Sequence, residues 1–465
     1  MTNSPIADSL SPSYWLEAAG VEPTRPLLGG DLDCDVVVVG AGFTGLWTAR
    51  ELLVRQPGLR VVVLEAERAG FGASGRNGGW CVPELNASLD VLTDQFGGQA
   101  VRDLQAALCE TVDEVRSALT EESIAAGFEC SGQLLLARGR YQLPLLRALE
   151  REYQRAGLGG HFQWLSPAQV AERIRVTDVV AGLYGAVGAT LDPGRAVRGL
   201  ARAVERRGAT IYERTPVLEV LPGRRPVAIT AWGRVRAQVV VLALEAYLTR
   251  LPGFRRRLLP VYSLITLTEP LTQEQLERVG WMQRFCLGSM RLSVDYLART
   301  EDRRILVGGR GAPYRYGSRI DAGNERHAPT HAALRARFRE WFPDLAQEVA
   351  FSHAWGGVLG MPRDWIPQFG FDRLAGIAYA YGYTGHGVAT ANLAGRTLAD
   401  LISGRESQLT RLPLVGHRSP AWEPEPLRWL GVRYVQGQLA QLDRRGARGG
   451  RPPSGRTVAE RLAHL

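Results

Sequence analysis

The segment Asp35–Gly45, DVVVVGAGFTG, continues as LWTARELLVRQ and is followed at Val61–Leu64 by a second apolar run, VVVL. Four consecutive valines between turn residues are typical of a strand that is buried on both faces, as in a parallel sheet. Between the two runs, apolar residues recur at helical spacing at Leu46, Ala49, Leu52 and Leu53. The segment therefore predicts a β-α-β unit, the building block of an α/β fold.

The turn between the first strand and the helix carries the pattern G-x-G-x-x-G at Gly40, Gly42 and Gly45. Gly40 permits a tight turn, Gly42 lets a pyrophosphate approach the backbone, and Gly45 lets the helix pack closely on the strand. Glu65 stands twenty residues after Gly45, where its carboxylate can accept hydrogen bonds from ribose hydroxyls. These positions predict a dinucleotide site and leave NAD and FAD open.

A second glycine-rich loop, Phe71–Trp80 with the sequence FGASGRNGGW, comes soon after the second strand. Backbone N–H groups of such a loop can face the phosphates of an extended cofactor, and Arg76 adds positive charge. An ordinary surface loop is the alternative interpretation.

The β-α-β pattern returns further along the chain. We expect a helix at 191–207, strands at 210–220 and 235–244, and, in the block 375–403, a strand, a turn at Gly382–Gly387 and a helix. Helical patterns also fill most of 89–126 and 141–156, with a strand at 131–138 between them. The dinucleotide domain is therefore predicted to be assembled from separated segments, with a second domain inserted between them.

Composition excludes several kinds of enzyme. The 465 residues carry a formal charge of +9, and all 56 basic residues are arginine, because the chain contains no lysine. Schiff-base enzymes, pyridoxal-phosphate enzymes anchored through lysine, and ATPases with a Walker lysine all need an ε-amine. The chain belongs to none of these classes.

The remaining composition favours a cytoplasmic protein. Five scattered cysteines without a C-x-x-C pair favour a reducing compartment and no structural metal. The polar N-terminus does not resemble a signal peptide, and no stretch approaches the roughly 18 apolar residues of a membrane span. Much of the positive charge lies at Arg444–Arg456, which is predicted to be flexible, so we expect no nucleic-acid partner.

Five segments appear in the order typical of one enzyme family: DVVVVGAGFTGLWTARELL, FGASGRNGGW, LDPGRAVRGLARAV, WGGVLGMPRDWIPQFG and GYTGHGVATANLAGRTLADLI. They resemble the FAD-dependent amine and amino-acid oxidoreductases that include glycine oxidase, D-amino-acid oxidase and monomeric sarcosine oxidase. The ASGRNGG and GYTGHG loops resemble the branch that contains gamma-glutamylputrescine oxidase. The resemblance spans 32–405.

The resemblance implies an α/β chain with a Rossmann-like FAD-binding domain and a substrate domain built on a mostly antiparallel sheet. We divide the chain into a leader at 1–32, an FAD-binding domain at 33–98, 190–245 and 355–405, a substrate domain at 99–189 and 246–354, and a C-terminal extension with a basic flexible tail at 406–465.

The resemblance also implies which residues contact FAD. The expected set is Gly40, Ala41, Gly42, Phe43, Thr44, Gly45, Glu65, Ala66, Ser74, Gly75, Arg76, Asn77, Gly78, Gly79, Val217, Gly385, His386, Gly387 and Val388. The helix after Gly387 adds a physical reason, because its N-terminal dipole can stabilise negative charge at the flavin N1 and O2 atoms. His386 adds to that field or touches the substrate, or else only shapes the turn.

Candidate catalytic residues on the substrate side are His386, Arg310, Tyr383, Tyr262 and Trp80. Arg310 and Tyr314 lie in a segment, ILVGGRGAPYRY, that resembles the strand above the flavin. Candidates for an aromatic wall around an amine or its cation are Tyr262, Trp80, Trp355 and Tyr383. A single aromatic residue is more often part of a core.

Three departures from the family pattern have consequences. Ala243, Leu244 and Glu245 stand where relatives usually have Ala-Thr-Gly or Ala-Thr-Asn. No cysteine lies near Gly357, where some relatives attach the flavin, so FAD is predicted to be noncovalent. The lysine that some relatives place above the flavin for reaction with oxygen is missing, and so is the lysine that binds carboxylate in sarcosine-type relatives, at the position of Ala389.

We therefore expect an FAD enzyme that removes hydride from a carbon bearing a neutral amine, passes it to flavin N5 and leaves an imine that water hydrolyses. Oxygen or another acceptor then reoxidises the flavin. Unless Arg310 binds a carboxylate, the pocket is expected to disfavour small α-amino acids. The alternatives are an NAD-dependent dehydrogenase and a flavoprotein without turnover that serves as a subunit or binding partner.

Overall fold

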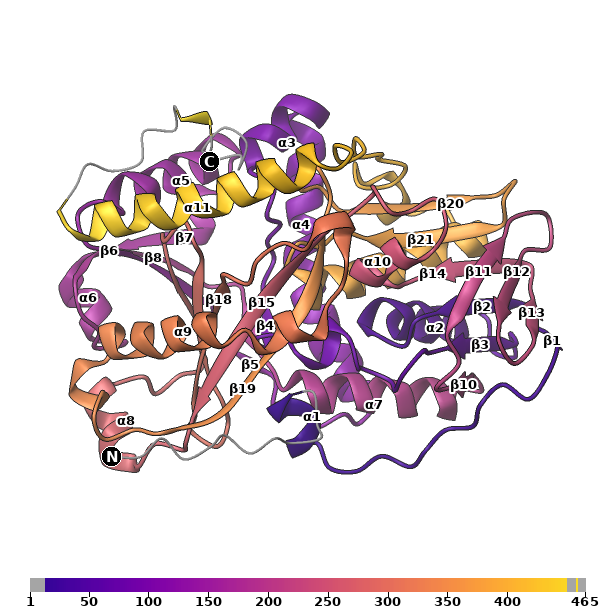
Figure 1. Cartoon of the computed structure of the whole chain (residues 1–465), viewed down its shortest axis with the longest axis horizontal. Helices are drawn as coiled ribbons and strands as arrows, with labels where there is room; N and C mark the ends of the chain where they lie inside the picture. The colour runs from indigo at the N-terminus through magenta and orange to yellow at the C-terminus, as the bar shows by residue number, and fades with distance from the viewer. Residues whose placement is uncertain (1–12, 450–456, 459–465) are drawn as a thin grey trace.

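The computed structural model describes residues 13–449 and 457–458. In Figure 1 a large sheet and its helices form the left part of the molecule, and a six-stranded sheet with its helices forms the right part. The helices are α1 (Tyr14–Ala18), α2 (Phe43–Arg55), α3 (Leu89–Phe96), α4 (Gly98–Glu121), α5 (Leu143–Arg155), α6 (Pro167–Ala171), α7 (Pro193–Arg206), α8 (Gln273–Val279), α9 (Ala328–Trp341), α10 (Gly387–Ser403) and α11 (Leu427–Ala447). No helix within these described ranges is long and apolar enough to cross a membrane.

The six-stranded sheet is the predicted dinucleotide-binding sheet. Five of its strands are parallel, and only the edge strand β20 is antiparallel to its neighbour. The strands, in spatial order, are β10 (Thr210–Tyr212), β3 (Val61–Leu64), β2 (Val36–Val39), β14 (Val239–Leu242), β21 (Ile377–Tyr381) and β20 (Gln368–Asp372). Three widely separated parts of the sequence therefore meet in one sheet, as predicted.

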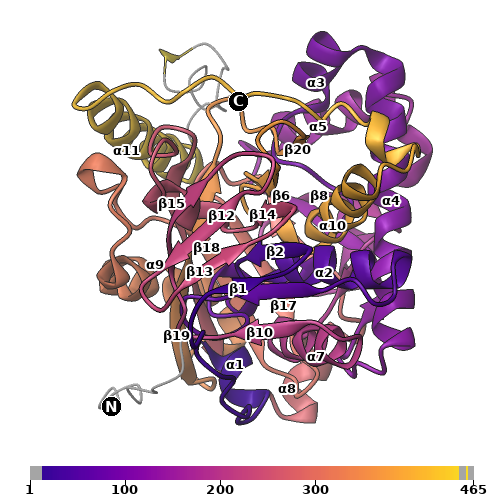
Figure 2. The ribbon, with the colours of Figure 1, turned by 90° about the vertical axis from the view of Figure 1, so that its right-hand side faces the viewer.

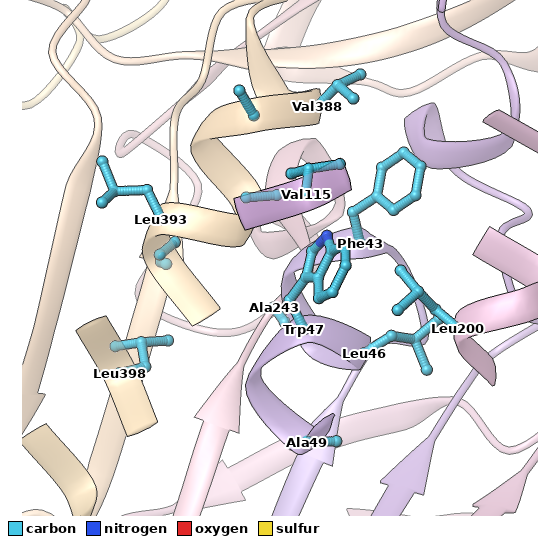
Figure 3. Close-up of a cluster of buried hydrophobic side chains, with 14 of the residues drawn as sticks. Phe43, Leu46, Trp47, Ala49, Val115, Leu200, Ala243, Val388, Leu393 and Leu398 are labelled. Carbon is cyan, nitrogen blue, oxygen red and sulfur yellow. The ribbon is translucent and has the colours of Figure 1, made fainter. Parts of the chain in front are cut away.

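Both faces of this sheet are buried, which explains the uninterrupted valines. Val36 and Val38 face a core formed with α2, α4, α7 and α10. Figure 2 shows these four helices on one side of the sheet, and Figure 3 shows Phe43, Leu46 and Trp47 of α2 among Val115, Leu200, Val388 and Leu393. Val37 and Val39 face the opposite core, which a smaller sheet covers.

That smaller sheet is four-stranded, and it places Val217 beside the cofactor site. Its strands are β1 (Leu32–Asp33), β13 (Arg234–Arg236), β12 (Val227–Thr230) and β11 (Val217–Leu221). Another small sheet, made of β4 (Trp80–Cys81), β9 (Ala189–Thr190) and β5 (Glu129–Cys130), follows the second glycine loop.

The large sheet has eight strands and, as expected, is mostly antiparallel, with one parallel pair between β16 and β6. Its order is β19 (Phe351–Met361), β15 (Leu259–Thr268), β18 (Ile305–Arg310), β17 (Asp295–Arg299), β16 (Cys286–Ser289), β6 (Gln133–Arg138), β8 (Val179–Gly185) and β7 (Phe162–Leu165). The helix α9 packs on this sheet through Leu334 and Phe338, in the same core as α8. Arg310, the last residue of β18, donates a hydrogen bond to the carbonyl of Thr384, which follows β21 of the six-stranded sheet.

The structure corrects two predicted strands. The segment 210–220 is not one strand, because the chain turns between β10 and β11, where Arg214 has a φ of 53° and Thr215 donates its N–H to the Glu65 carbonyl. The segment 235–244 is likewise divided between β13 and β14, because the N–H groups of Ala237 and Gln238 bond to Pro226 and Asp35.

Two segments pack differently from the expected division of the chain. Helix α4, predicted in the substrate domain, lies in the same core as α2 and α10. In the leader, α1 buries Trp15 and Leu16, and the Trp15 Nε1–H donates to the Asn77 carbonyl at 2.8 Å. The described part of the leader therefore supports the second glycine loop.

The first residues of the predicted flexible tail are helical. Arg444 and Arg445 form part of the last turn of α11, and residues 450–456 of that tail lie outside the described residues.

Candidate active site

A cavity of about 390 Å³ joins the two glycine loops to the turn before α10. We call it the cofactor cavity. Predicted residues that line it are Gly40, Gly42, Phe43, Thr44, Glu65, Ala66, Ser74, Asn77, Val217, Gly385, Gly387 and Val388. The other predicted residues, Ala41, Gly45, Gly75 and Gly79, pack behind these loops, and Arg76, Gly78 and His386 line the next cavity.

Close packing explains the glycines of the first loop. A Cβ atom at Gly42 would lie 2.9 Å from Ser74 Oγ, and that oxygen accepts the Phe43 N–H at 2.8 Å. A Cβ atom at Gly45 would lie 2.0 Å from the Gly40 carbonyl oxygen, so Gly45 is required for the fold itself. The two glycine loops are thus in direct contact at Gly42 and Ser74, where the sequence predicts the pyrophosphate.

Glu65 lies in the cofactor cavity in the position expected for a ribose ligand. Its two carboxylate oxygens accept the N–H groups of Ala41 at 2.8 Å and Glu67 at 3.0 Å. Burial raises the pKa of Glu65 to about 7. Ribose hydroxyls at this carboxylate would supply hydrogen bonds that stabilise its charged form.

Arg76, which is predicted to add charge near the phosphates, contacts two parts of the protein. Its Nε donates to the Phe71 carbonyl at 2.7 Å, and its Nη1 lies 2.5 Å from Glu325 Oε2. The Arg76 side chain is 2% exposed, and Glu325 also lines the cofactor cavity. This buried ion pair joins the second glycine loop to the segment that follows β18.

The departure at Glu245 also has a structural explanation. Glu245 lines the cofactor cavity, and its carboxylate accepts the N–H of Gly360 at 3.0 Å and the N–H of Gly382 at 2.7 Å. Burial raises the pKa of Glu245 to about 7. The carboxylate therefore connects the end of β19 with the start of the turn before α10.

The N-terminus of α10 is open toward the cavities. His386 is the N-cap residue, and its side chain forms no capping hydrogen bond. Gly387 and Val388, in the first turn, line the cofactor cavity, so the positive end of the helix dipole faces it. Burial lowers the pKa of His386, which favours the neutral imidazole at pH 7.

A second cavity of about 260 Å³ adjoins the cofactor cavity, and we call it the substrate cavity. The two share Ala73, Asn77, Leu359, Gly385 and Val388. Three predicted residues, Trp80, Arg310 and His386, line the substrate cavity together. The structure therefore brings these three side chains together around one cavity.

Arg310 is half-buried and lines the substrate cavity. Its Nη2 donates to the Thr384 carbonyl at 3.2 Å, and its guanidinium carbon lies 5.9 Å from the centre of the Trp365 ring. Within the described part of the chain it forms no ion pair with an acidic side chain, and burial lowers its pKa. Arg310 is thus a half-buried cation that has room for an anionic ligand.

Tyr383 and Tyr262 occupy other places. Tyr383 lines the cofactor cavity, where its hydroxyl lies 2.8 Å from Thr44 Oγ1. Tyr262 lies in the core of the large sheet, and its hydroxyl accepts the Asp321 N–H at 2.7 Å. Trp355 donates its Nε1–H to the Arg76 carbonyl, and Tyr314 donates to Glu425. These last three side chains support neighbouring segments.

Glu84 and Asn86 are site residues that the sequence analysis missed. Both line the substrate cavity, and Asn86 Nδ2 donates to the Thr384 carbonyl at 2.6 Å. Glu84 Oε1 accepts hydrogen bonds from Gln133 and Tyr153, whereas Glu84 Oε2 lies 3.9 Å from His386 Nδ1. Their position directly after the second glycine loop was the only sequence signal, because their partners lie far along the chain.

The cavities fit an extended FAD molecule. The cofactor cavity runs between Val217 and the glycine loops and continues to the positive end of α10, and a Cβ atom at Gly42 would meet Ser74. The residues that would hold FAD are therefore Gly42 and Ser74 at the phosphates, Glu65 at the ribose, and Gly387 and Val388 at the flavin.

Comparisons with known proteins agree with this geometry. The family model described as "FAD dependent oxidoreductase" (DAO) matches residues 35–401. Gamma-glutamylputrescine oxidoreductase of Escherichia coli (strain K12) is 31% identical over 395 residues, which cover 84% of this chain and 89% of that protein. The probable oxidoreductase OrdL of Haemophilus influenzae is 31% identical over 405 residues, which cover 86% and 89%.

Solved structures share the fold at lower identity. Glycine oxidase from Geobacillus kaustophilus superposes with a TM-score of 0.65 at 22% identity, covering 84% of this chain and all of that one (100%). L-proline dehydrogenase from P. horikoshii gives a TM-score of 0.65 at 21% identity, covering 83% and 96%. The chain is an enzyme that belongs to the DAO family of FAD-dependent oxidoreductases.

Proposed function

We propose that this enzyme oxidises the C–N bond of an amine that also carries a carboxylate some distance from the oxidised carbon. Bound FAD supplies the chemistry by accepting a hydride at N5, which leaves an imine that water hydrolyses. Because the family depends on FAD, we set aside the alternative of an NAD-dependent dehydrogenase. The protein's own residues bind the two ends of the substrate, exclude water and accept its proton.

Arg310 carries this proposal. Its half-buried guanidinium lines the substrate cavity and forms no ion pair in the described part of the chain, so a substrate carboxylate is its natural counter-ion. Arg310 lines the substrate cavity and also a further cavity that leads away from the cofactor, so its ligand can lie away from the reacting carbon. The E. coli relative, a gamma-glutamylputrescine oxidoreductase by name, supports an amine of this kind.

Glu84 and His386 provide for the amine end of the substrate. Glu84 Oε2 is available for an ammonium group, since the hydrogen bonds from Gln133 and Tyr153 go to Oε1. An ammonium must lose a proton before hydride can leave its carbon. His386 Nδ1, buried and without a hydrogen-bond partner in the described part of the chain, can accept that proton in the neutral imidazole.

Anaerobic reduction of the bound flavin tests the proposal. We expect N-γ-glutamylputrescine, which has a distal carboxylate, to bleach the flavin at least ~100-fold faster than putrescine, which lacks one. Preference for glycine, sarcosine or D-alanine would contradict the distal position and make Arg310 an α-carboxylate anchor. Failure of every amine to bleach the flavin would instead favour the flavoprotein without turnover.

We also expect the cofactor to be noncovalent. Cys81, the thiol closest in sequence to the second glycine loop, is fully buried in β4, and burial raises its pKa, so it forms little reactive thiolate. Acid or heat precipitation should release FAD into the supernatant. Yellow colour that stays with the pellet would show a covalent bond and direct attention to Cys81 or to a histidine.

Slow reoxidation of the reduced enzyme by oxygen is a further expectation. A fixed cation near the flavin lowers the barrier to electron transfer to oxygen, and the chain has no lysine to supply it. Burial favours the neutral form of His386, and Arg76 is paired with Glu325, so Arg310 is the candidate cation in the substrate cavity. In stopped-flow experiments, Arg310→Met should slow reoxidation by roughly tenfold or more, whereas His386→Gln should change it little. Fast reoxidation in both variants would show that neither side chain is needed.

A further inference from the structure

A third cavity, of about 350 Å³, continues from the substrate cavity away from the cofactor, and we call it the outer cavity. Seven residues line both: Glu84, Asn86, Leu149, Ser289, Met290, Val294 and Arg310. These residues come from four separate parts of the chain, and the two cavities adjoin where they meet. Arg310 and Glu84 therefore stand at the junction of two connected spaces.

Leucine side chains line much of the outer cavity, together with the charged side chains of Glu84, Glu152, Arg291 and Arg310. These leucines come from separate elements. They are Leu89 and Leu92 of α3, Leu104 of α4, Leu145 and Leu149 of α5, Leu439 of α11, and Leu85 and Leu292 of loops. Several of these leucines, including Leu89, Leu145 and Leu439, are only partly buried. Partly exposed leucines that surround a common space favour an apolar ligand.

Helix α11 is held firmly over this cavity. The Asp443 carboxylate is 1% exposed and accepts the N–H of Leu292 at 3.0 Å and the N–H of Ser293 at 2.8 Å. Leu439 lies four residues before Asp443, on the same face of the helix. The C-terminal extension thus contributes Leu439 to the wall of the outer cavity. Its Asp443 also holds the loop that contains Leu292, another residue of that wall.

We propose that the outer cavity is a second substrate subsite, which takes an uncharged alkyl or arylalkyl substituent while Arg310 holds the carboxylate at the junction. The proposal rests on the proposed function for the role of Arg310. It adds that the substrate extends beyond the carboxylate by an apolar group.

Carboxylic acids that cannot be oxidised provide a test that does not require turnover. Butanoate, hexanoate and octanoate are titrated into the FAD-containing enzyme, and Kd is read from the change in flavin absorbance. We expect affinity to rise by about fourfold per methylene as the chain enters the outer cavity. Equal affinity of the three acids for the wild-type enzyme would overturn the proposal.

Variants of α11 locate the alkyl chain. Leu439→Glu places a charge in the outer cavity only and should remove most of the dependence on chain length. Leu430→Glu is the matched control, because Leu430 lies on the same helix, is 54% exposed and should leave the dependence unchanged. Leu145→Glu, from α5, tests the opposite wall and replaces Leu439→Glu if that variant does not fold.

A chain-length dependence that survives both Leu439→Glu and Leu145→Glu would place the alkyl group elsewhere and overturn the proposal. Failure of the proposed function would look different. No amine would bleach the flavin, while the affinity for carboxylic acids would still rise with chain length.

Discussion

Replacing Gly42 by valine will give a folded protein that purifies without FAD. Even a single Cβ atom at this position would lie 2.9 Å from Ser74 Oγ, at the point where the two glycine loops meet in the cofactor cavity. The larger valine side chain would occupy the space through which the pyrophosphate must approach the backbone. The expected result is colourless protein, measured as the ratio of absorbance near 450 nm to that of the polypeptide.

Gly29→Val is the matched control for this experiment. Gly29 is exposed, and a Cβ atom there would meet nothing within 4 Å, so its flavin content should equal that of the wild type. Circular dichroism distinguishes loss of the cofactor from loss of the fold. Full flavin content in Gly42→Val would mean that the nucleotide lies elsewhere.

Replacing Arg310 by methionine should lower kcat/KM for the carboxylate-bearing amine by roughly 100-fold or more. Methionine keeps much of the length of the side chain and removes the charge, and loss of one partner of a buried, hydrogen-bonded charge pair commonly costs about 2–5 kcal/mol. The decrease should be much smaller for an amine without a carboxylate, since only the first substrate loses its counter-ion. Steady-state kinetics with both amines measure this difference.

Arg411→Met serves as the control, because the Arg411 side chain is 76% exposed and lies outside all three cavities. It should leave both rates unchanged. An Arg310→Met enzyme that oxidises both amines as well as the wild type does would remove Arg310 from substrate binding.

Local chemistry made the cofactor half of the site predictable from the sequence. The spacing of Gly40, Gly42 and Gly45 is dictated by contacts within a single turn, and the run Val36–Val39 is dictated by burial of both faces of one strand. Each pattern is complete within a few residues. The sequence therefore predicted both the parallel sheet and the residues around its glycine turn.

The substrate side depends on contacts between distant residues, and most of it could not be predicted. Glu84 is held by Gln133 and Tyr153, and Arg76 pairs with Glu325. No local pattern encodes such pairs. For the same reason, the periodicity of α4 predicted a helix and gave no information about which sheet it covers.

The assembly of the sheet from distant segments has a consequence for synthesis on the ribosome. Strand β2 and helix α2 emerge early, but α10, which covers α2, is complete only after Ser403. Until then the apolar side chains of α2 lack their partners on α10, and the nascent chain exposes a surface that can aggregate. The cofactor cavity, which Gly387 and Val388 line, is therefore complete only after most of the chain has been translated.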